Sequence, residues 1–190
     1  QYDPTRTSMH GGVYSLGLQK LAGSLRYSTN LRYAGAGMEA NDIGFVILVN
    51  DMSIRNSITK QTLRPTRRFR RLSGTLSNET HWTTGGTQSG ANVTASLTGE
   101  LRSFWTTHLM LTTYDIGGTR CVACARGGPA LRQSAERLLV ASVGGDARRI
   151  FTPSLSFVGS TGDEGRSNSR NVGVGSDLRL ASQYSMSLGL

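Results

Sequence analysis

Hydrophobic and polar residues alternate along most of this chain. Over positions 24–33, the odd positions hold Leu, Tyr, Thr, Leu and Tyr, whereas the even positions hold Ser, Arg, Ser, Asn and Arg. Successive side chains of a strand point to opposite faces, so this pattern predicts a strand with one apolar and one polar face. The alternation is equally clear over 92–102, 171–180 and 184–190, and weaker over 13–18, 72–82, 106–115, 137–144 and 150–158.

The segment 43–60 changes phase at Asn50-Asp51, because its apolar residues are odd before this point and even after it. A two-residue hairpin and a bulge within one long strand would both produce this change. We favour the bulge, because connections then alternate between two sets. One set is near 19–23, 61–70, 102–105, 145–149 and 181–183. The other is generally longer and Gly-rich, near 34–42, 83–90, 116–136 and 160–170. The segment 129–140 is the one place where we expect that a short helix could form.

The pattern therefore predicts about ten antiparallel strands in simple succession. Many span 9–12 residues, close to the roughly 9–11 residues with which a tilted strand crosses a bilayer. Aromatic residues gather near strand ends, as in the interfacial belts of outer-membrane barrels. The predicted fold class is all-β: an antiparallel up-and-down transmembrane β-barrel, present in part. A soluble β-sandwich or β-solenoid is the alternative, although small residues such as Ala95 and Gly99 would give it a sparse core.

Composition narrows the class of protein. Ser, Thr and Gly account for 66 of 190 residues, hydrophobic residues for 37% and charged residues for 17%. These values argue against a soluble helical protein and against a disordered chain. The formal charge of +9 and the basic group at 64–71 raise the question of nucleic acid. Without an accompanying binding motif, contact with anionic headgroups or simple solvation is the better interpretation, and no nucleic-acid partner is expected.

Several short segments carry a family resemblance. They are Asn-Asp-Ile-Gly-Phe at 41–45, the Arg-rich 64–71, Phe104-Trp105, Ala-Arg-Gly-Gly-Pro at 125–129 and Asp-Ala-Arg-Arg at 146–149. Their order and spacing resemble the C-terminal β-barrel domain of an uncharacterised bacterial family, whose members usually carry an N-terminal domain like the family 9 carbohydrate-binding modules. The resemblance implies a bacterial outer-membrane location and no particular chemistry. Together with the start at Gln1 and an end within an alternating run, it predicts that residues 1–190 are a fragment of one barrel domain. The N-terminal module and the C-terminal strands would then be missing.

Three groups of residues are candidates for function. Seven charged residues share the polar positions of the predicted strands and would line a lumen, as ion pairs, as contacts for anionic solutes or as a solvated wall. Arg126 precedes Gly-Gly-Pro and would constrict the pore or serve a structural turn. Cys121 and Cys124 are spaced for a loop disulfide, half a zinc site or a redox centre, of which we favour the disulfide. The seven lumen candidates are Arg26, Arg32, Arg55, Glu100, Arg102, Asp177 and Arg179.

We therefore expect an outer-membrane β-barrel that acts as a pore or membrane anchor, linked to binding or uptake of carbohydrate or another solute. Its expected partners are outer-membrane lipid and carbohydrate or a small anionic solute. A soluble β-rich binding or adhesion domain and a barrel-embedded hydrolase remain alternatives. No nucleophile elbow, phosphate loop or zinc-protease motif is present, so we expect no enzyme, cofactor or metal.

Overall fold

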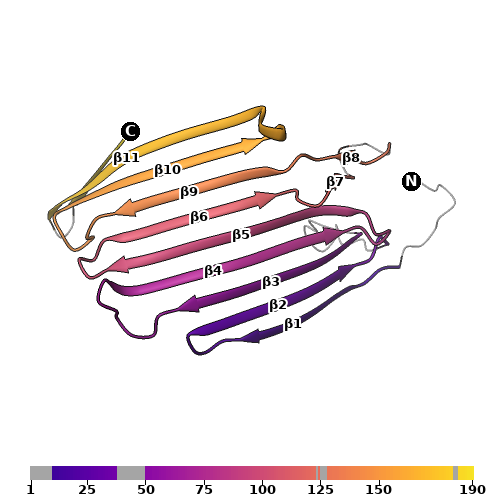
Figure 1. Ribbon diagram of the computed structural model, residues 1–190, viewed down its shortest axis with the longest axis horizontal. Helices are drawn as coiled ribbons and strands as arrows, with labels where there is room; N and C mark the ends of the chain where they lie inside the picture. The colour runs from indigo at the N-terminus through magenta and orange to yellow at the C-terminus, as the bar shows by residue number, and fades with distance from the viewer. Residues whose placement is uncertain (1–9, 38–49, 123, 125–127, 182–183) are drawn as a thin grey trace.

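The computed structural model describes residues 10–37, 50–122, 124, 128–181 and 184–190. These residues form one antiparallel sheet of ten strands, which confirms the predicted succession of about ten strands (Figure 1). No α-helix occurs in the described part, and no helix there is long and apolar enough to cross a membrane. In sheet order the strands are β1 (Val13–Lys20), β2 (Leu25–Ala34), β3 (Asp51–Gln61), β4 (Phe69–Trp82), β5 (Gln88–Leu101), β6 (Thr106–Tyr114), β9 (Glu136–Gly144), β10 (Phe151–Gly162), β11 (Ser167–Ala181) and β12 (Tyr184–Gly189).

The connections fall into two sets, as the alternation predicted, but their lengths differ from the expectation. Those after β1, β3, β5, β9 and β11 lie at one end of the sheet, which we call the short-turn end (Figure 1, left). At the other end, β4 and β5 are joined by only 83–87, and β10 and β11 by η2 (Asp163–Gly165) and Arg166. These two connections were predicted to be longer. Left-handed glycines make the tight reversals feasible, with φ of 83° at Gly86 and 89° at Gly165.

The phase change at Asn50-Asp51 coincides with the start of β3. Asn50 has a positive φ of 56°, and Asp51 is the first strand residue. From there β3 pairs with β2 along one edge and β4 along the other, so neither edge is open to the hairpin partner 43–49. The hairpin is therefore excluded within this sheet. Residues 43–49, on which the bulged strand depended, lie outside the described residues.

The strands are staggered along the sheet. Lys20, the last residue of β1, lies in the same cross-strand row as Gly159, which is eight residues from the start of β10, seven strands away. With about 3.3 Å per residue and about 4.8 Å between strands, the strands lean by about 40° away from the perpendicular to the line of short turns. Strands of β-barrels tilt by a similar angle, roughly 35–45°.

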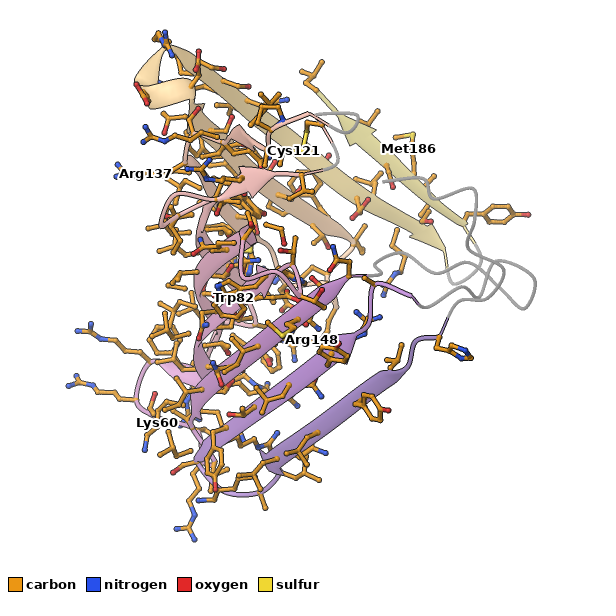
Figure 2. The ribbon with its side chains drawn as sticks, turned by 90° about the vertical axis from the view of Figure 1, so that its right-hand side faces the viewer. Lys60, Trp82, Cys121, Arg137, Arg148 and Met186 are labelled. Atoms are coloured by element: carbon orange, nitrogen blue, oxygen red, sulfur yellow. A yellow bond between two sulfur atoms is a disulfide. The ribbon has the colours of Figure 1, made fainter. Side chains whose placement is uncertain are left out.

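The sheet is curved and open. Seen along the strands, its first and last strands turn toward the same side, with Lys60 and Arg137 on the convex side and Arg148 on the concave side (Figure 2). In the described residues β1 pairs only with β2 and β12 only with β11, so the sheet is not closed into a barrel.

The long connection between β6 and β9 contains a small ribbon that the sequence did not predict. Its strands β7 (Arg120–Cys121) and β8 (Leu131–Arg132) pair in antiparallel fashion. Within the described residues of 129–140 the chain forms strand and irregular structure, so the short helix considered there is wrong. Leu138 and Val140 instead belong to β9 and pair with β10.

Candidate functional site

Cross-strand pairing assigns every strand residue to one of two faces. Asn30, Arg55, Glu79 and Asn92 form one row, and this polar face is the concave side of the sheet, whereas the face containing Lys60 and Arg137 is convex. Arg102 differs from the prediction, because it follows the end of β5 and lies in the turn, where its Nε donates to Thr66 O. The predicted residues with polar-face register are Arg26, Arg32, Arg55, Glu100, Asp177 and Arg179.

Five ionisable side chains form a continuous network across β2, β3 and β4. At its centre, His81 Nδ1 lies 2.9 Å from Asp51 Oδ1 and His81 Nε2 lies 3.1 Å from Glu79 Oε1. Asp51 also accepts a hydrogen bond from Arg32 Nη1 at 3.4 Å. Glu79 accepts one from Arg55 Nη2 at 2.6 Å. Asp51 is 3% exposed, so the network has a buried carboxylate at its centre and the exposed Arg55 at its edge.

The geometry of this network limits its chemistry. Both ring nitrogens of His81 are engaged by carboxylates, so neither is open to take a proton from Ser53, its cross-strand neighbour. Asp51 and Glu79 lie on opposite nitrogens of the ring and do not converge on one point. Among the described residues, no three His, Cys, Asp or Glu side chains are placed to hold a metal ion. The network can instead hold a fixed pattern of charge on the concave face.

A second cluster lies at the short-turn end. Phe104 has a left-handed backbone, with φ of 66°, and its ring lies between two guanidinium groups. Arg148 Cζ is 3.0 Å and Arg70 Cζ is 3.7 Å from the ring centroid. Arg70 also pairs with Glu100 at 3.1 Å, and Arg148 donates from Nε and Nη2 to the two oxygens of Asp146, each at 2.8 Å. These cation–π contacts and ion pairs fasten the turn after β5 to the turn after β9.

Asp146 should make the contribution of this cluster to stability depend on pH. Side-chain hydrogen bonds from Arg148 hold the pKa of Asp146 well below its usual value near 3.8, against the opposing effect of burial. A lowered folded-state pKa contributes stability above the unfolded-state value, and that contribution is lost as the pH falls toward the folded-state pKa. We expect Asp146→Asn to lower the urea midpoint at pH 7, and the gap from wild type to narrow below about pH 4.

The measurement is the urea midpoint of both proteins from pH 7 to pH 2.5. Asp163→Asn is the matched control, because the Asp163–Arg166 pair is exposed and should matter little at any pH. A gap between wild type and Asp146→Asn that stays constant to pH 2.5 would contradict the assignment.

The two cysteines lie in the connection between β6 and β9. Cys121 and Cys124 form a disulfide with a Cα–Cα distance of 5.4 Å. The connection is fastened to the start of β5, where Gln88 Nε2 donates to Ile116 O at 2.5 Å and to Thr119 Oγ1 at 3.1 Å. Arg126, the candidate for a constriction, lies outside the described residues.

Few large apolar side chains are buried in the described part of the chain. Of the described hydrophobic residues only Ala34 and Ala91 are buried, whereas the buried polar residues are Asp51, Thr112, Thr119 and Asp146. The exposed large apolar side chains of the convex face have 37–70% of their surface accessible and occur on nearly every strand. The members nearest the middle of the sheet are Leu76, Leu97, Leu109, Leu111, Leu139 and Leu155.

One polar row interrupts the convex face. Thr29, Asn56 and Asn78 are cross-strand neighbours there, and Asn56 Nδ2 donates to Asn78 Oδ1 at 3.3 Å. This hydrogen bond satisfies one donor of Asn56 and one acceptor of Asn78.

The sequence indicated some of these residues and missed others. The pattern placed Arg32 and Arg55 on the polar face, but it did not identify Asp51, Asp146 or Arg148. Glu79 and His81 share the polar parity of one strand, and this was the available signal for their proximity. Their connection to Asp51 needed the register between β3 and β4.

The fold and the site together define an all-β protein whose antiparallel sheet has a polar concave face and an apolar convex face. A family model described as "Domain of unknown function (DUF5916)" matches residues 2–190, so the chain belongs to this family. This confirms membership of an uncharacterised family. The outer-membrane location and the carbohydrate-binding-like module stay predictions. Comparisons with curated proteins and with solved structures find no match.

Proposed function

We propose that this sheet is the wall of a transmembrane β-barrel in a bacterial outer membrane, which serves as a pore or membrane anchor for uptake or binding of a solute. The observation that carries the proposal is the distribution of burial across the sheet: Asp51 and Thr112 are buried on the concave face, whereas large apolar side chains are exposed on the convex face. Monomeric soluble proteins rarely expose an apolar surface larger than a few hundred Å².

The geometry of the strands supports the same proposal. The lean of about 40° is within the range that barrel closure requires. On the convex face, at the end of the sheet opposite the short-turn end, Tyr14, Tyr33 and Trp82 share one cross-strand row with Met52. Tyr and Trp at the end of an apolar band are typical of a membrane interface. Tyr114, in contrast, has the register of the concave face and does not extend this row.

The concave face would be the wall of a water-filled lumen. Its charged network and the short-turn cluster supply both signs of charge, and Arg55 offers an exposed guanidinium to an anionic or polyhydroxylated solute. Near the last strands this face carries the small residues Gly173, Gly175 and Ser156. Carbohydrate and small anions are the solute classes that we propose.

Single-cysteine labelling in vesicles tests the orientation of the sheet. We expect cysteines at Arg26, Asn30 and Thr94 to react with a water-soluble maleimide, because these positions face the lumen. Cysteines at the adjacent positions Leu25, Leu31 and Leu97 should be protected by lipid. Equal reaction of the two sets would refute the proposed orientation.

The soluble alternative is tested by detergent dependence. A protein that remains monodisperse without detergent, and is absent from outer-membrane fractions, would favour a soluble β-rich binding or adhesion domain. The hydrolase alternative would need a nucleophile activated by a base, and the doubly engaged His81 offers no free nitrogen for that role.

A further inference from the structure

The net charge of the chain is concentrated at one end of the sheet. The five connections of the short-turn end and the adjoining strand ends contain twelve basic and three acidic residues, which equals the whole formal charge of +9. The other nine basic and nine acidic residues of the chain cancel. The twelve, which we call the basic rim, are Lys20, Arg26, Lys60, Arg64, Arg67, Arg68, Arg70, Arg71, Arg102, Arg148, Arg149 and Arg179.

Much of this charge is not neutralised within the protein. Glu100 pairs with Arg70 and Arg71, and Asp146 pairs with Arg148 and Arg149. In the connection between β3 and β4, three exposed arginine side chains make no ion pair or hydrogen bond within the described residues. They are Arg64, Arg67 and Arg68.

Exposed apolar side chains accompany the rim at every short turn. Leu21 follows Lys20, Leu63 precedes Arg64, Trp105 lies near Arg102, Ile150 follows Arg149 and Leu180 follows Arg179. These five apolar residues are 38–71% exposed. A soluble acidic partner or a nucleic acid would need the basic side chains, but it would not need an exposed apolar side chain beside them in every short turn. A bilayer interface needs both, because the apolar group enters the acyl boundary while the cation reaches the phosphate.

We propose that the members of the basic rim that lie outside the concave face, above all Arg64, Arg67 and Arg68, bind the headgroups of anionic phospholipids in the leaflet that meets the short-turn end. This inference rests on the proposed membrane-spanning sheet, and it adds the lipid class and the end at which that lipid gathers. Each Lys or Arg near an anionic membrane surface contributes an attraction that salt screens. The other end of the sheet, which lacks such an excess of basic residues among the described residues, should show no such preference.

The two tryptophans of the chain provide a test, because they lie at opposite ends. Trp105 is at the rim, where Arg102 of the same turn contacts the β3–β4 connection through a hydrogen bond from its backbone N–H to Arg68 O. Trp82 is at the other end, in the row with Tyr33. The protein is reconstituted in phosphatidylcholine vesicles containing phosphatidylglycerol, with one or the other lipid brominated. Trp82→Phe isolates Trp105, Trp105→Phe isolates Trp82, and the double variant supplies the background.

At Trp105 we expect quenching to show at least about a threefold preference for brominated phosphatidylglycerol, and at Trp82 no preference. Arg64→Gln/Arg67→Gln/Arg68→Gln should abolish most of the preference, as should 0.5 M salt, for which the Debye length is only about 4 Å. The matched control Arg120→Gln/Arg132→Gln/Arg137→Gln removes the same charge from the other end and should leave it unchanged.

Two other outcomes distinguish a failure of the lipid-binding inference from a failure of the proposed membrane-spanning sheet. If both tryptophans are quenched by each lipid without preference, the sheet spans the bilayer and the rim inference is wrong. If no brominated lipid quenches either tryptophan, the proposed function fails and the inference fails with it.

Discussion

Leu97→Arg should destabilise the protein in a bilayer by about 2–4 kcal/mol, the cost of an arginine on the lipid face near the middle of a membrane strand. Leu97 is on the convex face of β5, is 47% exposed, and is the cross-strand neighbour of Leu109 on β6. In a water-soluble sheet an arginine at so exposed a position would change stability by no more than about 0.5 kcal/mol. The sign and size of the effect therefore report which solvent covers the convex face.

Thr98→Arg is the matched control for Leu97→Arg. Thr98 is the next residue of β5, is exposed, and has the register of the concave face opposite His108. If this face lines a water-filled lumen, the same side chain should cost less than about 1 kcal/mol there. Urea unfolding in vesicles of a defined lipid gives both free energies. Similar losses for the two variants, or no loss for Leu97→Arg, would mean that lipid does not cover the convex face.

The face assignment was predictable because it depends on local parity. In β2, β5 and β11 the apolar and polar residues separate almost completely, so the strands and their two faces follow from the sequence alone. The pattern is weaker in β6, β9 and β10 for a structural reason. Met110, Val140 and Val158 are cross-strand neighbours on the concave face, and these apolar residues dilute the alternation.

The charged network could not be predicted because it depends on register over long separations. His81 meets Asp51 across 30 positions, and this needs the β3–β4 pairing that places Ser53 opposite His81. The Phe104 cluster similarly needs the turn after β5 to meet the turn after β9. Neither contact leaves a periodic signal in the sequence. The segment 129–140 was ambiguous because a short apolar run fits a helix or a strand, and pairing with its neighbours decided for strand.

The network makes Asp51 the residue of the concave face whose loss should be most costly. Asp51→Ala removes the buried acceptor shared by His81 Nδ1 and Arg32 Nη1 and leaves cationic or donor groups facing a void. Removing one partner of a buried ion pair costs about 3–5 kcal/mol. The side chains of Arg32 and His81 are 32% and 22% exposed, so water can hydrogen-bond to them once the carboxylate is removed. We therefore expect Asp51→Ala to lower the free energy of unfolding by about 2–3 kcal/mol.

Unfolding of Asp51→Ala, Asp51→Asn and Asp163→Ala by urea measures this cost. Asp51→Asn keeps an acceptor oxygen and should lose less than Asp51→Ala. Asp163→Ala breaks an exposed pair with Arg166 of 2.9 Å and should lose no more than about 0.5 kcal/mol.

A double-mutant cycle assigns the loss to the network itself. In a His81→Leu background, Asp51→Ala should cost at least about 1 kcal/mol less than in wild type, because the shared hydrogen bond is already absent. Equal costs in the two backgrounds would mean that Asp51 stabilises the start of β3 independently of His81. The concave face would then carry two separate ion pairs, Arg32–Asp51 and Arg55–Glu79, in place of one connected network.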